Sequence, residues 1–209
     1  MTNRPAARTA FTVPARTSSG PAYLVGRVTR TIRTSAGVVH PATPLGNETW
    51  LPIVRYKGRI GTALVVTPSG QRKARIDLAQ LTLSWTAARV DIDLSRLQLS
   101  VLRGDRVVGR FKVAAGGPAT PTPSGTFFVT DRVIFPASSP YGEFALGLSV
   151  NQKQPTPGWT GGDQVAIHGT SHPETIGTYA SLGCVRVSEA ALKVLYRAMP
   201  LGAPVTIHA

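Results

Sequence analysis

The stretch from 168 to 184, HGTSHPETIGTYASLGC, carries the single cysteine of a 209-residue chain. It joins the last long strand pattern of the sequence to its clearest helix pattern. Gly, Ser and Thr dominate this stretch, so little in it would bury a thiol. A cysteine that serves packing usually has apolar neighbours. This context favours a reactive role for Cys184.

Regular structure is predicted on both sides of this stretch. The apolar run GDQVAIH, 162–168, predicts a strand that ends at His168. After the cysteine, Ser188 is a good helix N-cap and Pro200 stops the helix. The apolar side chains between them fall at helical spacing, at Leu192, Leu195, Tyr196 and Met199. The final segment PVTIHA predicts one more strand.

Upstream of the stretch, residues 88–150 alternate apolar and polar side chains in short runs. Val90, Ile92 and Leu94 begin the pattern, and a turn at RGD, 103–105, joins two later runs. Further strands are expected at 127–129 and in YGEFALGLSV, 141–150. The pattern predicts antiparallel hairpins and a mainly β domain over 87–209.

The first third of the chain predicts a separate small unit. Strand-like pieces separated by turn residues fill the interval from Tyr23 to Trp85. They favour a small all-β module over 22–86, of the SH3-like barrel kind. Residues 1–21 show no periodicity, so a flexible N-terminal segment is expected there.

A strong positive charge limits the choice of partners. The chain has 23 Lys and Arg against 10 Asp and Glu, a formal net charge of +13. The arginines are scattered singly, without a basic helix, zinc-finger spacing or aromatic RNA-binding motif, so nucleic acid is not expected. Anionic cell-wall polymers fit the charge equally well. No run is apolar enough to span a membrane or form a signal-peptide core, so an export signal is expected upstream or already removed.

The residues around Cys184 suit covalent acyl transfer. A thiol ionises at neutral pH beside a cation such as imidazolium, and His168 lies at the end of a rigid strand. The backbone N–H groups of Gly183 and Cys184 are expected to form an oxyanion hole. The carbonyl of Gly169 can orient the imidazole, and Arg186 can bind a substrate carboxylate.

Metal binding is a competing interpretation of the same stretch. His168, His172 and Cys184 are the available ligands, yet Gly169 and Pro173 make the required helix unfavourable. Neither a fourth ligand nor a general-base glutamate stands at helical spacing. No metal and no cofactor are therefore predicted.

Other features have plainer interpretations. A lone cysteine is usually a small buried hydrophobe, and an isolated arginine such as Arg186 is usually a solvated surface residue. His40 and His208 are expected to be structural. The turn TPTPSG, 120–125, is interpreted as a structural hairpin. If it has a function, it is expected to border a cleft.

From Ala88 to Ala209 the chain closely resembles the L,D-transpeptidase catalytic domain, the YkuD family of bacterial cell-wall enzymes. The resemblance rests on IHGT followed by SLGCVRVS, then on ALKVLY and GAPVTI. Upstream, VDIDLSRLQLSVLRGDRVVGRFKVAAGG and PTPSGTF match the way such domains begin. The resemblance implies a β-sandwich with a short helix, and the first module is similar to the small β domains of actinobacterial members.

Roles for individual residues follow from this resemblance. It implies that Cys184 is the nucleophile, that His168 is the base, and that the carbonyl of Gly169 orients the base. Ser181 and Arg186 retain family residues.

Two further positions around the motif complete the expectation. Together with Ser181 and Arg186, Tyr179 is expected to contact substrate. Leu182 stands where family members usually have histidine, a departure that removes a second imidazole from the site. The expected consequence is a changed rate and pH dependence rather than a different activity.

The implied reaction is a crosslink between two diaminopimelate residues of peptidoglycan, outside the cytoplasm, in the cell wall or periplasm. Cys184 would attack a stem tetrapeptide, release D-alanine, and pass the acyl group to the amine of a second stem. Two alternatives remain open: an L,D-carboxypeptidase with the same nucleophile, and a non-catalytic wall-binding protein.

Overall fold

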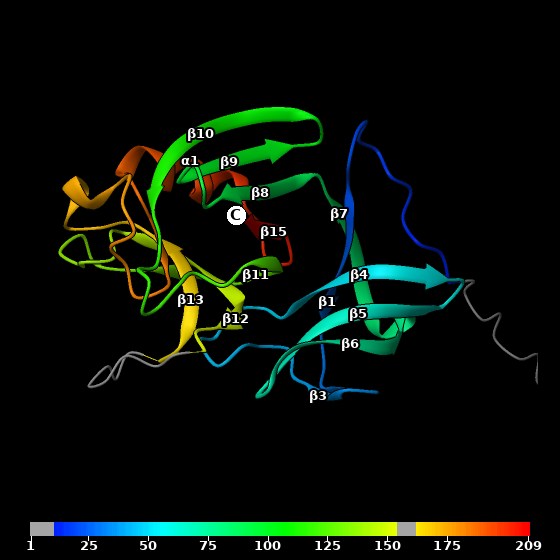
Figure 1. The fold of residues 1–209 in the computed structure, drawn as a ribbon. Coiled ribbons are helices and arrows are strands. Elements are labelled where there is room, and N and C mark those ends of the chain that lie inside the picture. The colour runs from blue at the N-terminus through cyan, green and yellow to red at the C-terminus, as the bar shows by residue number, and fades with distance from the viewer. Residues whose placement is uncertain (1–10, 154–161) are drawn as a thin grey trace, which may run out of the picture.

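A computed structural model describes residues 11–153 and 162–209. Strands dominate it, which confirms the mainly β prediction, and two β units lie side by side (Figure 1). The N-terminal unit contains seven strands and a short 3-10 helix: β1 (Tyr23–Val28), β2 (Ile32–Thr34), β3 (Gly37–Val39), β4 (Trp50–Lys57), β5 (Ile60–Thr67), β6 (Gly70–Asp77), η1 (Leu78–Gln80) and β7 (Leu81–Thr86).

The N-terminal unit is an open antiparallel sheet. Its strand order is β6-β5-β4-β1-β7, and β2 and β3 form a separate hairpin. The SH3-like barrel expected here is not confirmed, because the sheet does not close on itself. Its core is small, and Leu51, Val65 and Leu78 are among its fully buried side chains.

The segment that precedes β1 has no regular secondary structure over 11–21, yet it contacts the sheet. Phe11 and Val13 pack against the core of the N-terminal unit. The Trp85 indole N–H donates to the carbonyl of Pro14 at 2.8 Å. This part of the predicted flexible segment is therefore attached to the sheet, and residues 1–10 lie outside the described part of the chain.

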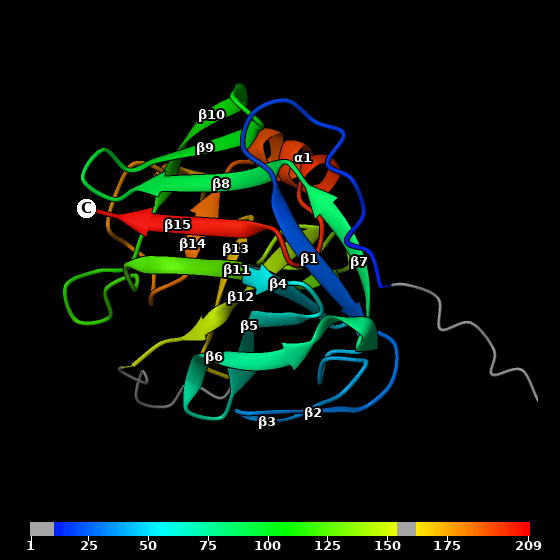
Figure 2. The same ribbon diagram turned by 90° about the vertical axis from the view of Figure 1, so that its right-hand side faces the viewer.

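The second unit is built on one closed sheet. Its eight strands are hydrogen-bonded in the order β10-β14-β13-β12-β11-β15-β8-β9, and the sheet closes into a barrel. The two layers expected of a sandwich are therefore parts of one sheet (Figure 2). The strands are β8 (Ala88–Asp93), β9 (Gln98–Arg103), β10 (Arg106–Ala114), β11 (Gly125–Ile134), β12 (Phe144–Asn151), β13 (Gln164–His168), β14 (Val185–Val187) and β15 (Pro204–His208).

The predicted helix is present as α1 (Glu189–Ala198), which follows β14. Ser188 caps it, since its hydroxyl accepts a hydrogen bond from the backbone N–H of Ala191. Ala191, Leu192 and Leu195 are buried in the core of the closed sheet. A 3-10 turn, η2 (Pro173–Thr175), lies in the loop between β13 and β14. No helix in the described part of the chain has the length and apolar character needed to cross a membrane.

The two units meet through polar side chains. Asp131 of β11 is only 3% exposed, and its carboxylate accepts hydrogen bonds from Thr43 and Asn47 of the N-terminal unit. It also accepts one from the amide of Gln164, the first residue of β13. Each unit nevertheless has its own apolar core. The domain boundary at 86/87 stays a prediction that these separate cores favour.

Candidate active site

Two parallel strands bring Cys184 beside His168. In the β13–β14 pair, Ile167 lies opposite Val185 and His168 lies opposite Arg186. Cys184 precedes β14 by one residue, and its sulfur accepts a hydrogen bond from the backbone of Ala166 in β13. Because alternate side chains of a strand share a face, His168, Cys184 and Arg186 lie on the same face of this pair. The sheet register therefore assembles residues that are sixteen positions apart.

The imidazole of His168 is fixed in one orientation. Its Nδ1 lies 2.6 Å from the carbonyl oxygen of Gly169, which can only accept, so Nδ1 carries the proton. The ring also forms a T-shaped contact with the ring of Tyr141, with 5.0 Å between centroids. The remaining nitrogen, Nε2, is then the free base of the ring. The orienting role predicted for Gly169 stays a proposal, which this hydrogen bond favours.

Burial keeps this imidazole neutral. His168 is 6% exposed, and desolvation lowers its pKa to about 4, with the charge of Arg186 acting in the same direction. The hydrogen bond to Gly169 opposes this shift but does not outweigh it. At neutral pH the ring is therefore an unprotonated base.

Burial also keeps the thiol protonated. Desolvation raises the pKa of Cys184, and this effect exceeds the opposing influence of the Ala166 hydrogen bond and the charge of Arg186. The sequence predicted that an imidazolium would ionise the thiol. The structure instead gives a neutral thiol beside a neutral imidazole, because both groups lose contact with water.

The turn that carries Cys184 is organised by Ser181. Its side chain is 3% exposed, and its hydroxyl donates to the carbonyl of Cys184 and accepts from the N–H of Gly183 at 3.1 Å. That N–H is therefore engaged and not free for a reacting oxygen in this state. Of the two predicted oxyanion-hole amides, Gly183 acts within the turn, and Cys184 remains a proposal.

Gly183 has a conformation that excludes other residues. Its φ is +115°, in the left-handed region. A Cβ at this position would lie 2.2 Å from the side-chain nitrogen of Gln152. The same amide of Gln152 donates to the carbonyls of Pro121 and Leu182, at 3.1 and 3.3 Å. Gln152 thus connects the turn that carries Cys184 to the loop that contains Pro121, a contact that no local sequence pattern predicted.

The loop 115–125 borders the turn that carries Cys184. The backbone N–H of Ser181 donates to the carbonyl of Ala115 at 2.9 Å. The carbonyl of Ser181 accepts from the backbone N–H of Gly117 at 3.0 Å. Thr122 accepts from the N–H of Gly116. The Pro-rich turn interpreted as a structural hairpin therefore lies directly beside Ser181.

Arg186 offers a charge without a counterion. Within 11–153 and 162–209, its guanidinium has no hydrogen-bond acceptor and no carboxylate partner. Its positive charge acts on both His168 and Cys184. A guanidinium in this position suits a substrate carboxylate.

The remaining predicted positions are more exposed. Tyr179 is 51% exposed, and its hydroxyl donates to the carbonyl of Leu94 at 2.7 Å, so only its ring is open to a ligand. Leu182 is 48% exposed. His172 is exposed and pairs with Glu174 rather than with the reaction centre.

The other two histidines also lie in surface contacts. His40 is near the hydroxyl of Thr31, and His208 pairs with Asp91. Among the residues that the structure describes, no three histidine, cysteine or carboxylate side chains gather into a metal-binding group.

Comparison with known proteins identifies the second unit. Residues 87–207 match the family model of the L,D-transpeptidase catalytic domain, YkuD. The chain belongs to this family. A Bacillus subtilis strain 168 protein that carries the name L,D-transpeptidase YkuD is 34% identical over 119 residues, which cover 57% of this chain and 63% of that protein.

A Bacillus licheniformis protein of the same name is 32% identical over 119 residues, 57% of this chain and 64% of its own length. The chain thus spans less than two thirds of these relatives. Among solved structures, an L,D-transpeptidase from Mycobacterium smegmatis gives a TM-score of 0.51 at 18% identity, with 88% of this chain and 77% of that chain covered. An L,D-transpeptidase from Mycobacterium tuberculosis H37Rv gives a TM-score of 0.51 at 17% identity, with 85% of this chain and 79% of that chain covered. The shared fold therefore includes much of the N-terminal unit.

Proposed function

We propose that this chain is a peptidoglycan L,D-transpeptidase that works through a thioester on Cys184. The observation that carries the proposal is the placement of His168: its Nδ1 is held by the Gly169 carbonyl, and it shares a face with the one cysteine of the chain. Membership of the L,D-transpeptidase family supports the same reaction class.

The first half of the reaction begins from the neutral pair. Nε2 of His168 takes the thiol proton while the sulfur of Cys184 attacks the carbonyl of diaminopimelate in a stem tetrapeptide. The negative charge that develops on the carbonyl oxygen is stabilised by the backbone N–H of Cys184. Arg186 holds a carboxylate of the donor stem through its free guanidinium.

Collapse of the tetrahedral intermediate breaks the bond to D-alanine. His168 returns the proton to the departing amine, which leaves a thioester on Cys184 and a neutral imidazole. An amine of a second stem then attacks the thioester and gives its proton to Nε2. The new amide joins two diaminopimelate residues, and the proton passes back to the sulfur.

Location and partners follow from this substrate. Peptidoglycan lies outside the cytoplasm, so we propose that the protein acts in the cell wall or periplasm. The net charge of +13 favours adhesion to anionic wall polymers. We assign the catalytic steps to 87–209 and wall attachment or spacing to 22–86. The mechanism uses no cofactor.

Intact-mass measurement tests the nucleophile. A carbapenem, whose strained carbonyl stands in for the stem carbonyl, is expected to add once to the folded chain. Cys184→Ala removes the acceptor and is expected to stay unmodified. Arg55→Gln, on the exposed part of β4, is the matched control and is expected to react like the parent. An adduct on Cys184→Ala would show that the nucleophile is assigned wrongly.

Product analysis then decides between the competing functions. With a tetrapeptide donor and an amine acceptor, a transpeptidase releases D-alanine and forms a crosslinked product. Release of D-alanine with only a tripeptide product would favour the carboxypeptidase, in which water resolves the thioester. A thiol that no acylating reagent modifies would favour the non-catalytic wall-binding protein.

A further inference from the structure

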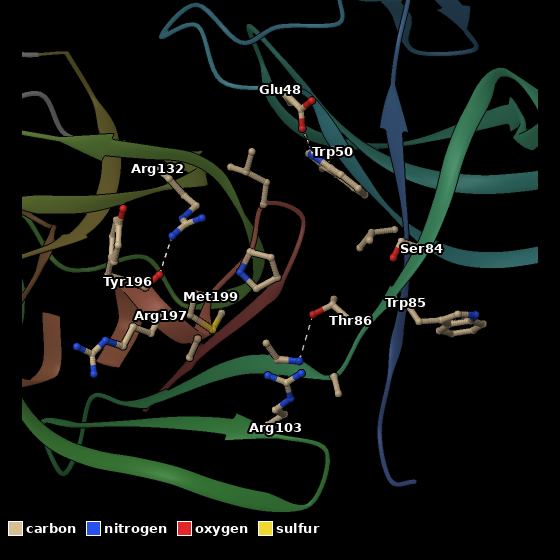
Figure 3. A pocket seen from close by; sticks show the side chains of 16 residues that line it. Glu48, Trp50, Ser84, Trp85, Thr86, Arg103, Arg132, Tyr196, Arg197 and Met199 are labelled. Carbon is tan, nitrogen blue, oxygen red and sulfur yellow. Dashed lines mark hydrogen bonds between the residues drawn. The ribbon is translucent and has the colours of Figure 1, made fainter. Parts of the chain in front are cut away.

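A second site lies at the other end of helix α1. A cavity of about 490 Å³ opens where the N-terminal unit meets the closed sheet (Figure 3). Trp50 of β4 lines it on one side, and Tyr196, Met199 and Pro200 line it at the end of α1. We call it the inter-unit cavity.

The inter-unit cavity has an excess of positive charge. Arg103, Arg132 and Arg197 line it, against one acid, Glu48. That acid already pairs with Arg27 at 2.6 Å. Its other carboxylate oxygen accepts a hydrogen bond from the indole N–H of Trp50, which is 3.1 Å away. The three lining arginines therefore have no carboxylate to neutralise them within the described residues.

Arg132 is held rigidly at the edge of this cavity. Its guanidinium lies 5.6 Å from the Phe144 ring centroid and 5.0 Å from that of Tyr196. One terminal nitrogen, Nη2, donates to the carbonyl of Tyr196 at 2.6 Å. Its Nε is buried without any partner, and Nη1 has no acceptor in the described part of the chain. The side chain is a fixed cation that lacks a counterion, which is the arrangement of a preorganised anion site.

Arg103 provides a second cation from another element. It is the last residue of β9, it is exposed, and its side chain makes no hydrogen bond or ion pair within the described residues. Figure 3 shows Arg103 and Arg132 on either side of Met199, whereas Arg197 points away from both. Met199 and Pro200 at the end of α1 and the indole of Trp50 also line the cavity. The cavity thus suits a ligand with an apolar or ring-shaped body and an anionic group.

We propose that the inter-unit cavity binds a carboxylate-bearing part of the peptidoglycan strand. The identity of this polymer rests on the proposed function. A guanidinium binds a carboxylate in a planar fork, and ring faces such as that of Trp50 stack on the body of the ligand. This contact would hold the polymer while another of its stems reacts at Cys184.

The occupant we propose is a stem other than the one that reacts. Cys184 precedes α1, whereas the cavity is lined by residues at the C-terminal end of this helix. A polymer with several stems can present one stem to Cys184 and another to the cavity.

The test measures binding of soluble, uncrosslinked peptidoglycan chains to the full-length protein in the Cys184→Ala background, so that the polymer is not processed. Arg103→Gln is expected to weaken binding about tenfold, the scale of one lost charge-assisted hydrogen bond, and Arg103→Glu to weaken it further. Both changes are at an exposed strand end and leave the core untouched. Arg55→Gln removes the same charge far from the cavity and is the control.

The chemical group is tested on the ligand. Converting the carboxylates of the polymer to amides is expected to weaken binding to the parent, and this loss is expected to shrink in Arg103→Gln, because the two changes remove the same contact. Equal losses in both proteins would overturn the proposal. So would unchanged binding by Arg103→Glu, or a preference for an anionic polyphosphate chain over peptidoglycan.

A parallel measurement separates this proposal from the proposed function. Acylation of Arg103→Gln with intact Cys184 by a carbapenem reports on the reaction centre without the polymer. If the parent forms no adduct, the proposed function fails while the binding result stands. If acylation proceeds but Arg103→Gln binds the polymer like the parent, only the cavity proposal fails.

Discussion

The two ends of helix α1 use charge in opposite ways. Before its first turn lie His168 and Cys184, both largely withdrawn from water and both neutral at neutral pH. Beyond its last turn lies the inter-unit cavity, where Arg103 and Arg132 keep permanent charges at an opening. In the functions proposed above, the reaction centre depends on proton transfer, and the cavity depends on electrostatic attraction.

This difference follows from how each site is built. The reaction centre lies on adjacent strands of a closed sheet, whose enclosed core removes water from the imidazole and the thiol. The cavity lies where an open sheet meets that closed sheet, so neither unit alone completes its walls. A closed sheet favours precise chemistry, and an opening between two units favours recognition of a long ligand.

The largest expected effect sharpens the comparison at the reaction centre. His168→Ala removes the proposed base, which would take the proton of a thiol that is not ionised beforehand. We expect carbapenem acylation to slow by at least ~100-fold, the scale for loss of a positioned base. Stopped-flow or mass-based kinetics measure this. His172→Ala, at an exposed histidine of the neighbouring loop, is the control. A rate close to that of the parent for His168→Ala would place the base elsewhere, with His172 next to be tested.

A second test uses acid pH. Because the pKa of His168 is about 4 in the folded state, the base is already free at pH 6, and the acylation rate is expected to fall only as pH drops through about 4. A steep loss centred near pH 6.5 would contradict the buried, neutral imidazole.

The same shift affects stability. The folded pKa lies below the unfolded value of 6.5, so the unfolded chain takes up a proton first as pH falls. The free energy of unfolding is therefore expected to decrease as the pH falls from 6.5 toward 4, by about 3 kcal/mol in all. Urea unfolding at pH 7 and pH 4.5 measures the loss, and a His168→Gln variant is expected to lose correspondingly less.

Salt concentration is expected to affect polymer binding and acylation differently, with a smaller effect than the substitution at His168. Raising the salt concentration from about 0.05 to 0.5 M shortens the screening length to well below 10 Å. Polymer binding at the arginines of the inter-unit cavity is expected to weaken several-fold, while acylation by a carbapenem stays within about twofold. Equal salt sensitivity of both measurements would remove the contrast between a buried and an exposed site.

The smallest expected effect is at Leu182. Since this side chain is 48% exposed, a histidine there would be in contact with water and would titrate near its ordinary pKa. We expect Leu182→His to change the acylation rate by less than about threefold, with a weak inflection near pH 6.5. Leu182→Gln controls for polarity. A change as large as that of His168→Ala would show that this position reaches the reacting atoms.

Local patterns in the sequence determined much of the closed-sheet unit. The 3.6-residue period and the Ser188 cap located α1, and the apolar run before His168 located β13, since periodicity and capping depend on neighbours in the chain. The single cysteine and the His168–Gly169 pair determined the residues of the proposed reaction centre. The SH3-like barrel was not confirmed, because short strands do not specify whether their sheet closes.

Only the tertiary structure decided the protonation states and the cavity. The shifts at His168 and Cys184 come from burial, which depends on distant strands packing around them. The engagement of Gly183 by Ser181 depends on the shape of one turn. Arg103 and Arg132 come from different strands and gain a shared opening only when two units meet. A sequence records which groups are present, whereas the dielectric around them and their separation in space arise from contacts between residues far apart in the chain.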